Sequence, residues 1–220
     1  MTEYRGDAFR VARLSFGLFL YAVGMVLMLH ANLGVSPWNV FHLGVAKHLK
    51  VSIGTAIAVT SGTIVAVSVI MREHVGLATV CNMFFVGFFV DFIIWAGWVP
   101  VRETMLSGVV MLVCGLFVIA VATFFYMGAG YGAGPRDSLM VVLTKRTGRS
   151  AGLCRFCLEG AALSAGWLLG GQVGVGTVIS VVGIGFAVQS VFTLLRFDVK
   201  KIDQESFGKT FARFRAWAWR

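Results

Sequence analysis

Six long apolar runs separate the polar segments of this chain, and their length restricts the folds that it can adopt. A helix of roughly 20 apolar residues crosses a hydrocarbon core of about 30 Å. Only 13% of the 220 residues are charged and 58% are hydrophobic, which lies outside the range of soluble domains. The sequence therefore predicts an all-α, polytopic membrane protein with about six transmembrane helices. The runs lie at about residues 14–33, 53–71, 76–99, 105–127, 152–169 and 173–195.

Two breaks rich in glycine and proline follow the first and the fourth run, at residues 34–37 and 132–135. Proline is well tolerated as the first residue of a helix, because its missing N–H group would have no partner there. We therefore expect a short helix after each break, over residues 37–49 and 135–147. Each is too short to span a bilayer. Re-entrant and interfacial placements both fit the sequence, and a crossing helix would change the topology.

The two halves of the chain are related by an internal repeat with an offset of 98 residues and no gap. A fixed offset over a long stretch indicates a tandem duplication. The units, residues 14–103 and 104–195, each hold three spanning runs. Because three is odd, the units face opposite ways across the membrane. The sequence thus predicts an inverted 3+3 repeat with a broken or re-entrant helix in each half. The offset superposes Gly17, Gly34, Pro37, Gly54 and Gly76 on Gly115, Gly132, Pro135, Gly152 and Gly174.

Basic residues lie mainly at the two ends of the chain and in the loops. Segments rich in Lys and Arg stay on the cytoplasmic side, so we expect residues 1–13 and the tail at residues 196–220 in the cytoplasm. The tail mixes basic and aromatic residues, which indicates an amphipathic segment on anionic lipid headgroups; a merely solvated tail is the alternative. The net charge of +9 does not indicate nucleic acid binding, because it is not gathered on one folded face.

The two breaks form the candidate substrate site. A helix that begins after a break leaves its first N–H groups without helical partners and has the positive end of its dipole there. Arg136 adds a full charge, and Asp137 can cap N–H groups or pair with Arg136, so a carboxylate or phosphate would bind well. A tight turn with a local ion pair at the headgroups is the alternative. The candidate substrate-binding residues are Pro37, Asn39, Gly132, Gly134, Pro135, Arg136 and Asp137.

Polar residues within the runs are candidates for proton or ion coupling, because ionisable groups in hydrocarbon are expensive and usually face the bundle interior. Asp91 lies deep in the third run, and the offset pairs it with Gln189. Glu159 lies in the fifth run, four residues after Arg155. A salt bridge within the helix is the alternative for Glu159. Hydrogen bonding between helices is the alternative for the other polar residues.

We find no catalytic, metal-binding or cofactor motif in the sequence, and we expect the protein not to be an enzyme. The four histidines lack the spacing of metal ligands. Cys154 and Cys157 form a C-x-x-C motif at the start of an apolar run, without a second cysteine pair. Buried, unreactive thiols explain this motif better than redox or zinc chemistry.

Three segments of the chain resemble those of a known family. The first break reads Leu-Gly-Val-Ser-Pro-Trp-Asn-Val-Phe-His, the second reads Gly-Ala-Gly-Pro-Arg-Asp-Ser-Leu-Met, and residues 166–178 read Gly-Trp-Leu-Leu-Gly-Gly-Gln-Val-Gly-Val-Gly-Thr-Val. Together they resemble the YczE/YitT-like bacterial integral membrane proteins. The resemblance implies a bacterial inner-membrane protein, from a family whose activity is poorly defined. Asn39 departs from the family pattern, which has Asp there, and this leaves Asp137 as the only acid of the pair.

Inverted repeats with broken helices at matching positions are the architecture of many secondary transporters. The sequence therefore predicts a small transporter or permease for an anionic or amphipathic solute. A non-transporting accessory or regulatory protein, which acts through a protein partner, is the alternative. The sequence is also compatible with a homodimer.

Overall fold

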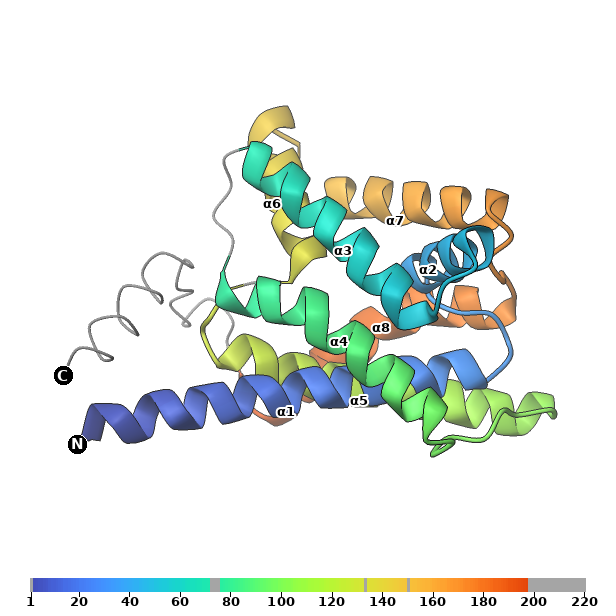
Figure 1. Cartoon of the computed structure of the whole chain (residues 1–220), viewed down its shortest axis with the longest axis horizontal. Helices are drawn as coiled ribbons and strands as arrows, with labels where there is room; N and C mark the ends of the chain where they lie inside the picture. Colours follow the sequence, from blue (N-terminus) through green and yellow to red (C-terminus); the bar gives the residue numbers. More distant parts are fainter. Residues whose placement is uncertain (1, 72–75, 133, 150, 198–220) are drawn as a thin grey trace.

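The computed structural model describes residues 2–71, 76–132, 134–149 and 151–197, and within them the chain forms eight α-helices (Figure 1). Within these ranges, the structure does not describe the side chains at positions 2–7, 137, 141, 151 and 152. Residues 198–220, most of the predicted tail, also lie outside the described residues. The helices are α1 (Thr2–His30), α2 (Pro37–Leu49), α3 (Ile53–Ile70), α4 (Leu77–Trp95), α5 (Met105–Gly128), α6 (Pro135–Thr147), α7 (Ala151–Leu168) and α8 (Val175–Leu194).

Five of the described helices are long and apolar enough to cross a membrane, judged by length and composition alone. They are α1 from Ala8 onward, α3, α4, α5 and α8. The all-helical membrane fold expected from the sequence is therefore confirmed. The fifth predicted run forms α7, which is not among these five helices. Arg155 and Glu159 lower its mean hydropathy.

The first helix extends beyond the apolar run into the polar segment that precedes it. Two arginines of this extension bind the C-terminal end of α5. Arg10 Nε donates to the carbonyl oxygen of Ala129 at 2.8 Å, and Arg13 donates to that of Phe124 at 3.2 Å. The carbonyl groups at the end of a helix form the negative end of its dipole, so guanidinium groups bind well there.

α1 and α5 lie antiparallel along each other (Figure 1). Near one end Gly17 packs against Tyr126, and near the other end Gly108 packs against Ala31. Residue numbers therefore rise along one helix as they fall along the other. Glycines allow this close approach of two helix backbones. The main hydrophobic core surrounds the pair and includes buried residues of α4 and α8.

Each short helix packs mainly against a helix from the opposite half of the chain. α2 contacts α7, and α6 contacts α3. α2 and α7 cross where glycines meet. A Cβ atom on Gly44 would lie 2.6 Å from the carbonyl oxygen of Gly166. A Cβ atom on Gly166 would lie 2.6 Å from the carbonyl carbon of Val40. The two backbones are thus in direct contact at this crossing.

Each glycine break lies against the start of a helix from the other half. Gly34 has a φ of +91° and packs against Gly174, which precedes α8. Gly132 has a φ of +108° and packs against Gly76, which precedes α4. A positive φ favours glycine, and the backbones at both places are too close to admit a side chain.

Hydrogen bonds between backbone groups join the same segments. The N–H group of Gly176 donates to the carbonyl oxygen of Leu33 at 2.6 Å, and that of Ala78 donates to the carbonyl oxygen of Tyr131 at 2.9 Å. These contacts fix the positions at which α2 and α6 begin, and so determine where the side chains of their first turns lie.

Candidate functional site

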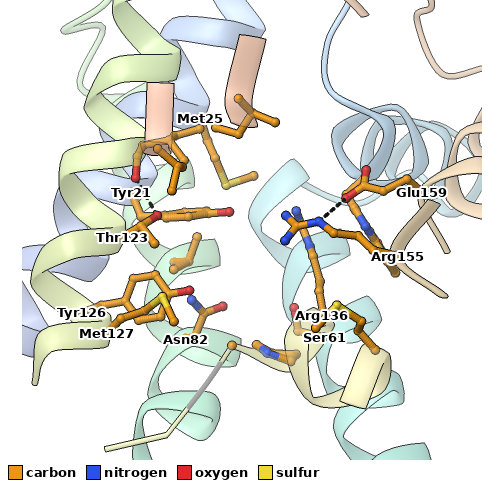
Figure 2. A pocket seen from close by; sticks show the side chains of 18 of the residues that line it. Tyr21, Met25, Ser61, Asn82, Thr123, Tyr126, Met127, Arg136, Arg155 and Glu159 are labelled. Carbon is orange, nitrogen blue, oxygen red and sulfur yellow. Dashed lines mark hydrogen bonds and ion pairs between the residues drawn. The ribbon is translucent and has the colours of Figure 1, made fainter. Parts of the chain in front are cut away.

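A cavity of about 400 Å³ lies among the eight helices, and each helix contributes at least one residue to its lining. Figure 2 shows the side chains around it, most of which are apolar or aromatic. A concave, largely apolar site with a few converging polar groups is typical of small-molecule binding. In chain order from α1 to α8, the lining includes Tyr21, Trp38, Ile57, Val86, Ile119, Arg136, Glu159 and Ile184.

Arg136 extends into this cavity from the first turn of α6 (Figure 2). Pro135 begins the helix directly after Gly134, and both also line the cavity. Arg136 Nη2 lies 3.0 Å from His42 Nε2, and the guanidinium carbon lies 5.0 Å from the centre of the Trp38 ring. A hydrogen bond and a cation–π contact from α2 therefore orient the guanidinium group.

His42 is buried, and its contact with Arg136 determines which ring nitrogen carries the hydrogen. A guanidinium group can only donate, so Nε2 accepts and the neutral ring carries its hydrogen on Nδ1. This Nδ1 atom has no hydrogen-bond partner among the described residues. His42 lies on α2, which is not one of the five spanning helices. Its burial is the main cause, and the charge of Arg136 the second, that holds the pKa of His42 well below its ordinary value.

Arg155 and Glu159 add a second charged pair to the lining. They lie four residues apart on α7, and Arg155 Nε is 4.0 Å from Glu159 Oε1 (Figure 2). Together with Arg136, the described lining contains two guanidinium groups and one carboxylate. These charges leave one positive charge in excess, which favours an anionic ligand.

A second cavity of about 300 Å³ adjoins the first. Both are lined by Arg136, Arg155 and Glu159. Along α5, the first cavity extends to Met127 and the second to Leu116. These two residues are 11 positions apart, or about 16 Å along a helix. The charged residues therefore lie where two cavities meet, and the cavities extend from there toward opposite ends of α5.

Some of the predicted substrate-binding residues line one of the two cavities, and the others do not. Gly134, Pro135 and Arg136 line the larger cavity, and Pro37 lines the smaller one. Asn39 is buried on α2 and belongs to neither lining. Gly132 shapes the break through its contact with Gly76. The side chain of Asp137 lies outside the described residues.

Of the three residues predicted for ion coupling, only Glu159 lines a described cavity. Asp91 accepts hydrogen bonds from the N–H group of Gly54, at 2.8 Å, and from the hydroxyl of Ser52. It thus caps the start of α3, a position that favours a carboxylate. Gln189 is exposed on α8 and donates to the hydroxyl of Thr193 at 3.3 Å. The coupling roles of all three residues stay predictions.

Three aromatic residues of the site were not predicted from the sequence: Tyr21, Trp38 and His42. A signal was present for the last two, because residues four apart share one face of a helix and this helix begins at a break. Tyr21 gave none, since it is one aromatic residue among several in its apolar run.

Comparisons with known proteins agree with this membrane fold. Residues 8–193 match the family described as "Family of unknown function (DUF6198)". The chain is 30% identical over 191 residues to an uncharacterized membrane protein, YczE, from Bacillus subtilis. This alignment covers 84% of this chain and 88% of that protein. The chain is also 29% identical over 185 residues to an uncharacterized protein from Haemophilus influenzae, and this alignment covers 84% of each of the two chains. No solved structure matches the chain.

Proposed function

This chain belongs to the DUF6198 family of unknown function, and we propose that it is a small secondary transporter for an anionic or amphipathic solute. The observation that carries the proposal is the position of Arg136, which lies where two adjoining cavities meet. In many transporters the positive dipole end of a broken helix points at an anionic group of the solute, and Arg136 adds a full charge at such a helix start.

Contacts between the halves of the chain support an inverted 3+3 repeat. The contact of Gly34 with Gly174 has its counterpart, 98 residues on, in the contact of Gly132 with Gly76. The antiparallel packing of α1 on α5, and the exchange of α2 and α6 between halves, have the same symmetry. In this arrangement α7 is the sixth span, and its charged pair faces the cavities rather than lipid.

Transport in such a repeat proceeds by alternating access, in which one half rocks against the other around a fixed site. The solute enters through one cavity, binds Arg136 and leaves through the other. Glu159 is the candidate for a coupled proton, because it lines both cavities beside Arg155. The chemistry is binding and movement alone, without a cofactor or an enzymatic step.

In this proposal the protein lies in the bacterial inner membrane with both termini in the cytoplasm, as the basic end segments favour. The tail binds anionic lipid headgroups. A homodimer is compatible with the proposal and is not required by it, since each of the eight described helices of one chain already lines the larger cavity.

Thiol labelling tests alternating access without knowledge of the solute. All four native cysteines are first replaced by serine. Ser61→Cys then reports on the larger cavity and Ser36→Cys on the smaller one, whereas Ser164→Cys on α7 lines neither and serves as the control. We expect a membrane-impermeant thiol reagent to reach Ser61→Cys mainly from one side of sealed vesicles and Ser36→Cys mainly from the other.

Labelling of both positions from the same side only, or of neither, would contradict transport. It would favour the alternative, an accessory protein that acts through a partner. The Ser164→Cys control shows how much of the signal comes from reagent that reaches the outer surface of the bundle.

A further inference from the structure

We infer that the solute of this site is an amphipathic organic monoanion: one carboxylate or similar singly charged group on an apolar body. This inference rests on the proposed transporter function and narrows its substrate class. It comes from three features of the cavity, namely the number of its charges, the orientation of Arg136 and the chemistry of the opposite wall.

The charge of the lining matches a single anionic group. Arg155 faces Glu159 at 4.0 Å on its own helix, so this pair is close to neutral. Arg136 contacts a neutral imidazole and an indole ring, and no described carboxylate pairs with it. One unbalanced guanidinium in a largely apolar cavity favours one negative charge, because a second would be buried without a partner.

The guanidinium of Arg136 is held in a geometry that suits a carboxylate. Its bond to His42 uses one of five N–H donors, and the Trp38 ring lies over it. The remaining donors can form the paired hydrogen bonds by which arginine binds carboxylates. Burial of the His42 imidazole costs free energy, because its Nδ1 has no described hydrogen-bond partner. In return, the imidazole holds the guanidinium group of Arg136 in place.

The wall across the cavity from Arg136 is largely apolar and aromatic, with the amide of Asn82 among its few polar groups. Figure 2 shows Tyr21 and Tyr126 there, with their rings edge to face at a centroid distance of 6.2 Å, and Met25 and Met127 beside them. The hydroxyl of Thr123 already donates to its own helix. This wall favours an apolar body over a hydrated polyanion, and a cavity of about 400 Å³ has room for both body and head.

Thermal denaturation of the purified full chain with matched small probes tests the assignment. The principal probe is 3-phenylpropionate. Its amide, 3-phenylpropionamide, has the same body without the charge, and propionate has the charge without the body. Inorganic phosphate and citrate represent hydrophilic anions. We expect 3-phenylpropionate to raise the denaturation midpoint, and the other probes to raise it less or not at all at equal concentration.

Fatty acids of the membrane and water-soluble organic acids share a single carboxylate on an apolar body. Decanoate, added as a further probe in the same denaturation experiment, distinguishes these two sources. A larger shift with decanoate assigns the solute to the bilayer, and a larger shift with 3-phenylpropionate assigns it to the aqueous phase. Both results keep the class.

Variants locate the binding. Arg136→Gln should weaken binding of 3-phenylpropionate about tenfold or more, because a charge-assisted hydrogen bond is lost. Arg146→Gln, in the exposed last turn of the same helix, should leave it unchanged. Val188→Phe narrows the cavity from α8 and should reduce binding while it keeps the charge. Arg136→Lys, which also keeps the charge, should retain part of the affinity and shows whether position 136 tolerates substitution.

Three results would overturn the assignment: equal stabilisation by the acid and its amide, stronger stabilisation by phosphate or citrate, or no stabilisation by any probe. The labelling of Ser36→Cys and Ser61→Cys does not depend on these probes. A failure of the substrate class is therefore distinguishable from a failure of the transporter proposal.

Discussion

The pairing of His42 with Arg136 joins the first half of the chain to the second at the level of single side chains. The imidazole accepts from a permanent cation, so it has to stay neutral in the folded protein. In α2 it is also fully enclosed, which adds to the free energy of protonating it. The residue therefore makes the stability of the fold depend on pH.

We predict that acidification destabilises the protein through His42. Above about pH 6.5 the ring is neutral in both the folded and the unfolded chain. Below that pH the unfolded ring binds a proton while the folded ring, whose pKa is lowered, does not. The free energy of unfolding then falls by up to about 1.4 kcal/mol per pH unit.

Denaturation midpoints measured between pH 5 and pH 8 check this prediction. His42→Gln retains an acceptor for Arg136 and cannot titrate, so its midpoint should fall less between pH 7 and pH 5. The other three histidines contribute equally to both proteins and cancel in the difference. Parallel curves for wild type and His42→Gln would show that His42 is protonated in the folded state.

Among elements, the sequence predicted the helices but not which helices pack together. Both short helices have the predicted bounds, because Pro37 and Pro135 determine where each begins. The partner of each helix could not be read from the sequence. Glycines at a crossing, such as Gly44 and Gly166, look the same in a sequence as glycines that face lipid. Only a folded chain shows which backbones meet.

The same distinction explains the outcome for the candidate site. Arg136 and Glu159, which line both cavities, stood out in the sequence because a charge next to a break, or inside a span, is unusual on its own. Asp91 has the same unusual sequence context, yet it caps α3. Its partner is the backbone of another helix, which a sequence pattern does not show. His42 was missed for the converse reason, since its significance comes from a contact with a residue 94 positions away.

We predict that Gly166→Ala destabilises the crossing of α2 on α7 by about 1–3 kcal/mol, because the new Cβ atom would overlap the backbone of α2. Gly160→Ala on the same helix is the matched control, since nothing lies within 4 Å of a Cβ atom there. It should be neutral or stabilising by up to about 1 kcal/mol. Thermal denaturation of both variants checks the prediction, which fails if they melt together.

At the scale of the whole molecule, the halves are bound to each other more than each is bound within itself. The short helices pack mainly on the opposite half, and both breaks lie against helices of the opposite half. The segment that connects the halves, residues 101–104, is exposed and belongs to no helix. We therefore expect that the fold does not require covalent continuity at that point.

We predict that residues 1–103 and 104–220, expressed together as separate chains, assemble into one complex. An affinity tag on either fragment should recover both in equal amounts from detergent extracts. Each fragment expressed alone should be recovered poorly, because its short helix and its break lack their partners. Stable, monodisperse recovery of a single fragment would contradict this prediction.

The break at Gly34 also bears on how the protein is made. Its partner, Gly174, lies 140 residues further along the chain. At 5–20 residues per second, a ribosome needs about 7–28 seconds to reach it. Throughout that interval the break at Gly34 lacks its partner, so we expect the first half to reach its final packing only after α7 and the start of α8 have been synthesised.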